Sequence, residues 1–281
     1  MIKILVDSAS DIEANEARDL GVTLAPIQVR FGEEEFLDGV TITRRQFFEK
    51  LIESDELPKT SQINEFTFCE HFEKLTEDGS EVLAVTLSSK LSGTYSSAVK
   101  AAAKFGGKVR VVDSMNATIG ERILLQYAVR LVKSGLGLNE AAEKLEKSKG
   151  KIQLLAVLDT LHYLKKGGRI SSVAALAGKM LSIKPVVSVT DGEVKLVGKA
   201  LGSKNGNNLL TRLVDKCGGI DFDMPYALGY SGLSDEYLKK YLKDSESLWK
   251  DKTDCVPSHM IGSTIGTHVG PGAIAVAFFA K

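Results

Sequence analysis

The stretch LAVTLSSKLSGTY, residues 83–95, joins an apolar strand to the start of a helix through hydroxyl residues and a glycine. Val82 to Leu87 has the length and residue types of a buried strand, and Gly93 to Lys104 is predicted as a helix that ends at Gly106-Gly107. Ligands collect beyond the carboxyl ends of strands in parallel sheets, and the free N–H groups of a helix N-terminus favour an anion. Residues 83–95 therefore decide the expected fold and give the first candidate site.

Short apolar runs alternate with amphipathic segments on both sides of this stretch. Further strands are predicted at Ile2 to Val6, Val22 to Val29 and Val109 to Val112. This alternation is typical of a parallel sheet that is covered by helices. The first half is therefore predicted to be an α/β unit.

The second half has a different pattern. Asp191-Gly192 is typical of a hairpin turn, and it separates two predicted strands, Pro185 to Thr190 and Val194 to Gly198. A hairpin indicates antiparallel pairing, so this half is predicted to be mixed α+β.

Two domains are expected on this basis. The boundary is placed at the polar segment that ends at Gly150, which gives an α/β domain over residues 1–150 and an α+β domain over residues 151–281. One of the helices predicted in the second domain covers Val173 to Leu181.

Composition excludes several classes of protein. The 281 residues are 43% hydrophobic with a mean hydropathy of -0.01, which is ordinary for a globular protein. Lys plus Arg and Asp plus Glu number 36 each, so the basic excess that drives nucleic-acid binding is missing. Cys69, Cys217 and Cys255 lack the spacing of a zinc site or a disulfide framework. No stretch has the length of a signal peptide or an integral membrane segment, so we expect a cytoplasmic location.

Hydroxyl residues mark the candidate site. Ser92 and Thr94 are placed to hold an anion, although Ser92 is equally suited to cap the helix, and both interpretations stay open. Asp7 and Asp113 follow two other strands that should end at the same edge of the sheet, and we interpret them as structural caps. Thr60-Ser61-Gln62 is a further cluster of hydroxyl and amide groups in a loop after a proline.

A glycine-dense segment, Gly262 to Gly272, contains His268 in a predicted loop. Glycines permit close approach of the backbone to a ligand, and a histidine there can donate a hydrogen bond to a carboxylate, although a surface histidine is the alternative. No Lys-Ser or Lys-Thr follows the glycines as a phosphate-binding P-loop requires, and no G-x-G-x-x-G follows the first strand. Neither ATP nor a dinucleotide is therefore expected as a cofactor.

Two patterns in the sequence are related to those of hydrolytic enzymes. Gly229-Tyr230-Ser231-Gly232 lacks the second spacer of the hydrolase motif G-x-S-x-G. A triad of Ser92, His268 and Asp113 stays open, because triads are recognised by geometry rather than by chain order.

The chain resembles the DegV family in a set of motifs that run in family order over nearly its whole length. They are Asp7-Ser8 with Asp11, Thr60-Ser61-Gln62, Ser88 to Tyr95, Val112-Asp113-Ser114, Tyr163 to Ser171, Lys184-Pro185 and Gly270-Pro271-Gly272. The resemblance implies a bacterial fatty-acid-binding protein with two α/β domains and a lipid tunnel. Some members are subunits of fatty acid kinase, and they present a bound fatty acid to a separate, ATP-using subunit that is related to dihydroxyacetone kinases.

The resemblance also implies roles for particular residues. Thr60, Ser92 and His268 would hold the fatty-acid carboxylate, with Ser61 and Gly93 beside them. The segment around Arg169 would lie near the tunnel mouth and the kinase docking face.

Two departures from the family pattern concern the T-S-Q loop and the kinase. Ile63 follows T-S-Q where the family often has proline, so the shape of that loop is open. After the second-domain hairpin, residues 199–204 read KALGSK, where members that serve the kinase often carry arginines.

The leading hypothesis is a non-enzymatic carrier of a long-chain fatty acid, which is buried between the two domains. The alternative is a serine-dependent acyl hydrolase that uses Ser92. A protein whose bound lipid is a signal rather than a cargo would share the same site. Lys165, Lys166 and Arg169 form the densest basic cluster near a family motif, and we predict that they dock the kinase. A solvated basic helix end is the alternative for this cluster.

Overall fold

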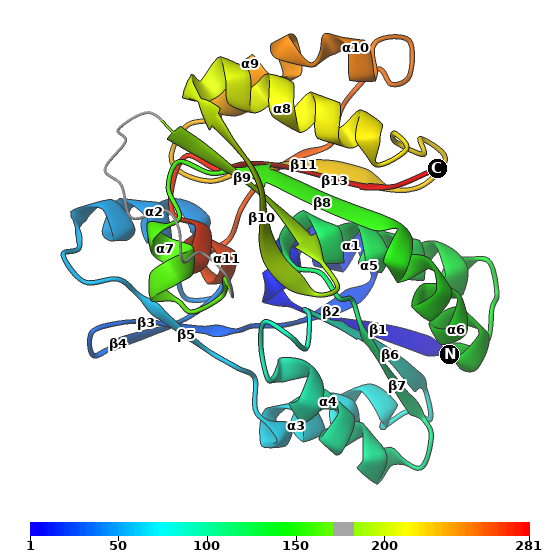
Figure 1. Cartoon of the computed structure of the whole chain (residues 1–281). Helices are drawn as coiled ribbons and strands as arrows, with labels where there is room; N and C mark the ends of the chain where they lie inside the picture. The colour runs from blue at the N-terminus through cyan, green and yellow to red at the C-terminus, as the bar shows by residue number, and fades with distance from the viewer. Residues whose placement is uncertain (171–182) are drawn as a thin grey trace.

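Two β-sheets with helices between them organise the chain, which the computed structural model describes over residues 1–170 and 183–281 (Figure 1). The four-stranded sheet is parallel throughout. Its order is β2 (Val22–Ala25), β1 (Ile2–Asp7), β6 (Glu81–Thr86), β7 (Val109–Asp113). The parallel sheet predicted for the first half is thus confirmed.

Helices cover both faces of this sheet. On the outer face lie α3 (Glu65–Thr76) and α4 (Thr94–Ala102), and on the other face lie α1 (Ala14–Leu20), α5 (Thr118–Lys133) and α6 (Leu138–Ser148) (Figure 1). The carboxyl ends of β1, β6 and β7 lie together, as predicted. Asp7 accepts hydrogen bonds from the N–H groups of Ala9 (2.9 Å) and Leu87 (2.8 Å).

The six-stranded sheet is mixed. Its order is β10 (Glu193–Leu201), β9 (Ile183–Thr190), β8 (Ile152–Val157), β13 (Ile274–Phe279), β11 (Tyr226–Tyr230), β12 (Ser258–Met260). The predicted hairpin is present between β9 and β10, and Asp191 and Gly192 both have positive φ, as its tight turn requires. The outer face is covered by α8 (Gly202–Lys216), α9 (Glu236–Asp244) and α10 (Glu246–Trp249) (Figure 1).

A third, antiparallel sheet was not foreseen. It has the order β4 (Glu34–Leu37), β3 (Gln28–Phe31), β5 (Lys59–Ser61). The single strand predicted over Val22 to Val29 was wrong, because the segment is divided at Pro26, which has no N–H to donate to a strand ladder.

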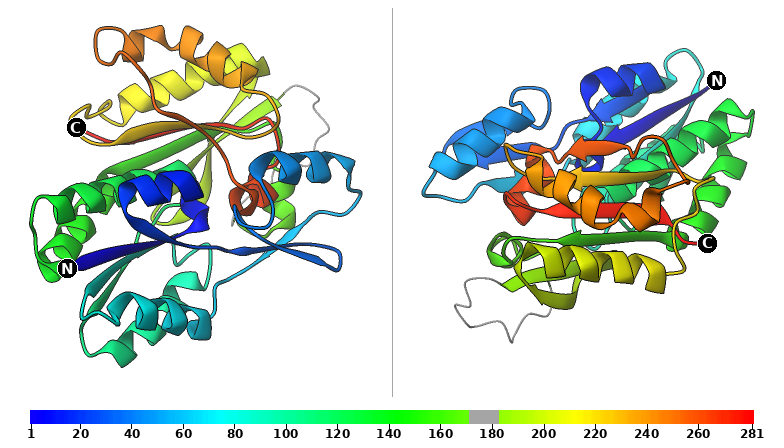
Figure 2. Two further views of the ribbon diagram at one scale, coloured as in Figure 1. Left: turned by 180° about the vertical axis from the view of Figure 1, so that it is seen from behind. Right: turned by 90° about the horizontal axis from the view of Figure 1, so that it is seen from above.

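Helices from distant parts of the chain pack beside this third sheet. They are α2 (Arg44–Glu53), α7 (His162–Lys166) and α11 (Ser263–Val269). Figure 2 shows from behind that α11, near the C-terminus, lies beside α2, although more than 200 residues separate them. This packing brings the end of the chain back to its first third.

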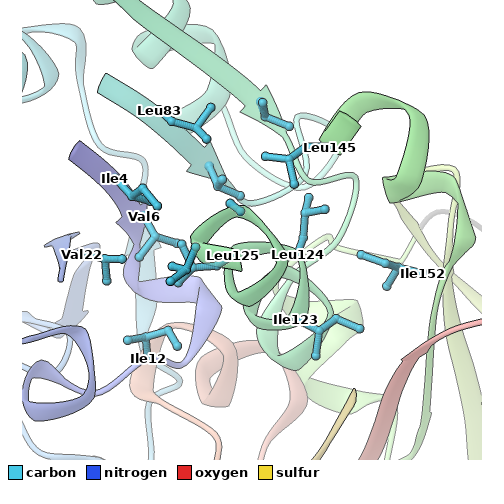
Figure 3. Close-up of a cluster of buried hydrophobic side chains, with 14 of the residues drawn as sticks. Ile4, Val6, Ile12, Val22, Leu83, Ile123, Leu124, Leu125, Leu145 and Ile152 are labelled. Atoms are coloured by element: carbon cyan, nitrogen blue, oxygen red, sulfur yellow. The ribbon is translucent and has the colours of Figure 1, made fainter. Parts of the chain in front are cut away.

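Helix α5 forms the centre of the core. Its buried side chains pack against the four-stranded sheet on one side and the six-stranded sheet on the other. Figure 3 shows Leu124 and Leu125 of α5 among Ile4 and Leu83 of the parallel sheet and Ile152 of β8. Burial of this apolar surface fixes the spacing between the sheets.

The described residues contain no helix that is both long and apolar enough to cross a membrane. The helix predicted over Val173 to Leu181 lies outside them. The division into two domains at residue 150 stays a prediction.

Candidate functional site

A cavity of about 310 Å³ lies between the two large sheets, next to β5 and α11. Its floor is one face of the six-stranded sheet, made by alternate residues such as Leu154, Ala156 and Leu158 in and after β8. Ala156 keeps partial exposure in a central strand because it faces this cavity. Most of the other lining side chains are apolar, and they include Ile27, Leu87, Val187, Val189, Val194, Ile265 and Ala275.

Polar groups gather at one end of the cavity. The structure brings together all five residues that the sequence analysis assigned to a carboxylate, and each of them lines the cavity: Thr60, Ser61, Ser92, Gly93 and His268. They come from three segments, namely β5, the loop before α4, and α11. We call these five residues together with Arg169 the polar end.

His268 lies on a helix and not in a loop, so the prediction of a loop histidine was wrong. The segment 263–269 forms α11 because two carboxylates from the first half of the chain bind the N–H groups at its start. Its glycine, Gly266, packs closely against Phe47 and Phe48 of α2, where a larger residue would clash. Gly266 is therefore needed for close packing between two helices.

The pKa of His268 is lowered to about 4, mainly by burial and also by the charge of Arg169, so the ring is neutral at pH 7. Its Nε2 lies 2.9 Å from Thr60 Oγ1, whereas Nδ1 is buried and has no partner among residues 1–170 and 183–281. A proton on Nδ1 would be an unsatisfied buried donor, which is costly. We therefore assign the proton to Nε2, which donates to Thr60 and leaves the Thr60 hydroxyl proton available.

Ser92 has a similar arrangement. Thr94 Oγ1 accepts from the N–H of Ile63 (3.3 Å), so the Thr94 hydroxyl proton can point to Ser92 Oγ, 3.0 Å away. The N–H of Thr94 also donates to Ser92 Oγ (3.3 Å). With two donors on its oxygen, Ser92 has its own proton available for a ligand. Two hydroxyl donors without an acceptor suit a carboxylate, which only accepts hydrogen bonds when ionised.

Ser92 lies one residue before the N-cap of α4, and its role in holding an anion stays a prediction. The N-cap of α4 is Gly93, and Ser92 precedes it while still accepting one N–H of the first turn. Gly93 itself makes room for Gln62, since a Cβ at this position would overlap the Gln62 amide. The Gln62 amide donates to Ser97 Oγ (3.2 Å) and so connects the β5 loop to α4.

Arg169 supplies a positive charge at the polar end. Its Nε donates to the carbonyl oxygen of Leu91 (3.2 Å) and its Nη1 to that of Gly167 (2.6 Å), so the guanidinium is held in place. Arg169 is half-buried, whereas Lys165 and Lys166 are exposed at the end of α7. The predicted basic cluster is thus divided between the cavity and the surface.

A second, outer groove reaches the polar end from the surface. Thr60, Arg169 and His268 line both the groove and the cavity. The rest of the groove is lined by residues that include Lys59, His162, Tyr163 and Lys166 and the acidic Asp55 and Glu56. It gives a route by which a macromolecule could approach a carboxylate held at the polar end.

The hydrolase triad is not assembled in the described part of the chain. Ser92 pairs with Thr94 and His268 pairs with Thr60, and no hydrogen bond joins Ser92 to His268 there. Asp113 accepts from the N–H groups of Ser89 and Met115. Asp113 therefore orients a loop, which agrees with its interpretation as a structural residue.

Comparison with known proteins covers the whole chain. The family model described as "Uncharacterised protein, DegV family" matches residues 1–281. The chain belongs to the DegV family. A DegV domain-containing protein from Deinococcus radiodurans is 33% identical over 280 residues, which cover 98% of this chain and 97% of that protein. Another from Caldanaerobacter subterraneus is 31% identical over 283 residues, which cover 100% and 99%.

Solved structures share the DegV fold with this chain. A DegV family protein from Thermus thermophilus, described for its fatty acid binding, has a TM-score of 0.89 and 27% identity, with 100% of this chain and 99% of that chain covered. A stearic-acid-binding protein from Eubacterium ventriosum has a TM-score of 0.86 and 28% identity, with 99% and 97% covered. The two-sheet α/β architecture predicted from the sequence is therefore the architecture of the family.

Sequence reasoning missed the residues that form the floor of the cavity. Leu154, Ala156 and Leu158 alternate along and after the strand, but the sequence does not show that this face of the sheet borders a cavity. It also missed the close approach of Gln62 to Gly93. The T-S-Q and S-G-T motifs to which they belong are far apart in the sequence, and no local pattern indicates that they meet.

Proposed function

We propose that this DegV-family protein is a non-enzymatic carrier of one long-chain fatty acid. The observation that carries the proposal is that Thr60 and Ser92, each with an available hydroxyl proton, line a cavity whose other walls are mostly apolar. The hydroxyls and Arg169 suit a carboxylate, and the floor suits an alkyl chain, whose burial contributes about 0.8 kcal/mol per methylene. The fatty-acid-binding relatives from Thermus thermophilus and Eubacterium ventriosum support the same ligand class.

Native mass spectrometry of the purified protein tests this proposal. We expect a complex with one fatty acid, which extraction and mass spectrometry will identify, and uptake of oleate or palmitate by the delipidated protein. Only apo protein together with no uptake of either added fatty acid would contradict the proposal.

The alternative, a serine-dependent acyl hydrolase that uses Ser92, is less well supported. A nucleophilic serine needs a base within hydrogen-bond reach and a third group that orients the base. In the described residues Nδ1 of His268 has no partner, and its Nε2 is engaged by Thr60. Incubation with 4-nitrophenyl palmitate separates the two functions, because a carrier is expected to release no nitrophenol above the Ser92→Ala background.

We further propose that the protein presents the bound carboxylate to a separate fatty acid kinase of the dihydroxyacetone-kinase type. The outer groove reaches the polar end, and its lining includes Lys166 beside the acidic Asp55 and Glu56. Lys165 precedes Lys166 in the chain, and the positive charge of these two exposed lysines would steer an acidic partner. Arg169→Ala does not isolate docking, because Arg169 also lines the cavity and holds the Leu91 carbonyl.

The docking test therefore uses the exposed lysines. Lys165→Ala with Lys166→Ala should reduce acyl-phosphate formation in a reconstituted kinase assay at low salt and leave the lipid content unchanged. Lys239→Ala with Lys240→Ala, an exposed pair on α9, is the matched control. Equal acyl-phosphate formation by the two double variants would remove Lys165 and Lys166 from the docking surface.

A further inference from the structure

Helix α11 carries much of the ligand site but is too short to be stable alone. It has seven residues, and four of them line the cavity: Thr264, Ile265, His268 and Val269. Isolated helices of this length do not persist in water, because the cost of nucleation exceeds the gain from so few hydrogen bonds. The placement of His268 therefore depends on the contacts that hold α11 in the protein.

Asp38 binds the start of α11. It follows β4 and is 3% exposed. Its Oδ1 accepts from the N–H (3.0 Å) and the hydroxyl (2.5 Å) of Ser263, and its Oδ2 accepts from the N–H of Thr264 (3.1 Å). A carboxylate is well suited to this position, because the first N–H groups of a helix have no partner within the helix and carry partial positive charge.

Asp11 also binds the start of α11, and it connects that helix to α5. It is 1% exposed; its Oδ1 accepts from the N–H of Gly262 (2.8 Å), and its Oδ2 accepts from the hydroxyl of Thr118 (2.5 Å). Thr118 lines the cavity and has a φ of 50°, which a β-branched residue rarely adopts. The backbone oxygen of Asp11 is itself held by Arg44 (2.6 Å) and Arg122 (2.5 Å).

Neither carboxylate is among the residues that line the cavity, so neither has a direct role in holding a ligand. Both join the first half of the chain to a helix more than 220 residues away. At the other end of that helix, His268 reaches Thr60 Oγ1. The position of the His268 ring is thus determined at the start of α11.

We propose that Asp38 and Asp11 are positioning residues for carboxylate binding, which act by fixing the N-terminus of α11 and thereby the ring of His268. This inference rests on the proposed function. If the bonds from Asp38 or from Asp11 are lost, α11 can shift. Nε2 of His268 then no longer donates to Thr60 Oγ1, and the Thr60 hydroxyl proton is no longer directed to the ligand. The ligand then loses a donor although every group that touches it is still present.

A double-mutant cycle separates this role from general stabilisation. We would measure oleate affinity for the delipidated parent, Asp38→Ala, His268→Ala and the double variant. Asp38→Ala should weaken affinity about tenfold in the parent and about twofold or less once His268 is absent, because the two substitutions remove the same interaction. An equal loss in both backgrounds would overturn the proposal. A parent that is purified only as apo protein and takes up neither oleate nor palmitate would overturn the proposed function as well.

Two milder variants cover the case in which Asp38→Ala does not fold. Asp38→Asn keeps one acceptor oxygen, and Ser263→Ala removes only the hydroxyl bond to Asp38, so we expect about threefold weaker binding for each, again only when His268 is present.

The matched control for stability is Ser245→Ala. Ser245 is the buried residue between α9 and α10, and its hydroxyl oxygen accepts a hydrogen bond from Trp249 Nε1 (2.9 Å). It lies outside the cavity lining. We expect the substitution to lower the melting temperature and leave affinity unchanged. In addition, the ¹³C resonance of carboxyl-labelled oleate should move in Asp38→Ala in the direction seen for His268→Ala, and stay in place in Ser245→Ala. A resonance that moves equally in Ser245→Ala would contradict the positioning role.

Discussion

The floor of the cavity and its polar end are built in different ways. On the floor, neighbouring strands place their residues in register, so that Ala156 of β8 is paired with Ala275 of β13 on one side and with Val187 of β9 on the other. At the polar end, Thr60 and His268 are 208 residues apart and meet through one hydrogen bond between their side chains. The floor follows from sheet register, whereas the polar end depends on single long-range contacts.

This difference separates two properties of the site. A substitution on the floor changes the volume that an alkyl chain can occupy, and its effect should depend on chain length and not on pH. A substitution at the polar end changes hydrogen bonds to the carboxylate, and its effect should be the same for long and short fatty acids. Four predictions test this division, in order of decreasing effect.

The largest expected effect concerns ionisation at the polar end. The pKa of His268 is lowered from 6.5 to about 4, mainly by burial, so the folded protein disfavours its charged form. The stability that depends on the neutral ring is therefore fully present above about pH 6.5, is lost progressively as the pH falls to about 4, and changes little below that. Relative to His268→Gln, the parent should lose up to about 3 kcal/mol of unfolding free energy between pH 7 and pH 4.

Urea unfolding of the delipidated proteins at several pH values measures this difference. His162→Gln, at an exposed histidine, is the control and should follow the parent at every pH. Ala156→Leu on the floor should also keep a constant difference from the parent. The prediction is wrong if His268→Gln and the parent show the same pH dependence.

The second prediction concerns the floor. Ala156→Leu adds three carbon atoms where the alkyl chain is expected, so oleate should lose contacts worth about 2 kcal/mol, or roughly thirtyfold in affinity. Decanoate, which needs less of the cavity, should bind almost as it does to the parent. Ala200→Leu on β10, outside the cavity lining, is the matched control. Equal losses for oleate and decanoate would show that the substitution disturbs the polar end.

The third prediction concerns a single donor. Ser92→Ala removes one hydrogen bond to the ligand carboxylate, which is worth about 1.5 kcal/mol or more, so affinity should fall about tenfold. The loss should be the same for oleate and decanoate, in contrast to Ala156→Leu. Ser96→Ala, at an exposed position of the same helix, is the control. A lower melting temperature with unchanged affinity would instead make Ser92 only a helix cap.

Much of the fold was predictable because local patterns determine it. Alternating strands and helices indicated the parallel sheet, and Asp191-Gly192 indicated the hairpin, since both depend on residues that are close in sequence. The β3–β4–β5 sheet was missed because its strands are short, with three to four residues each, and β5 pairs with β3 across the intervening α2. Short strands of this kind leave little periodicity in a sequence.

The candidate site was predictable only in part. Hydroxyl residues at strand and helix ends pointed to Ser92, and the family motifs added Thr60 and His268, but no local pattern shows that α11 is a helix. Its formation depends on Asp11 and Asp38, which bind its N–H groups from far away in the sequence. The empty space on the floor was equally unpredictable, because it arises from the distance between two sheets rather than from any one segment.

The smallest expected effect distinguishes two explanations for Gly93. The family resemblance places Gly93 beside the carboxylate, whereas in the structure a Cβ at this position would overlap Gln62 Oε1. Gln62 is exposed and flexible, so in Gly93→Ala it should move away and give up its bond to Ser97. The β5 loop would then hold Thr60 less firmly, and we expect about threefold weaker oleate binding, as for loss of one part-buried hydrogen bond.

The double variant decides between the two explanations. Gln62→Ala alone should also weaken oleate binding about threefold, because it removes the same contact between the β5 loop and α4. If Gly93 is required only to make room for Gln62, then Gly93→Ala costs nothing further once Gln62 is absent, and the double variant should bind like Gln62→Ala. A loss of about ninefold would mean that the two effects are independent. Gly93 would then be needed for close approach of the ligand itself, and the polar end would depend on backbone shape as well as on its side-chain donors.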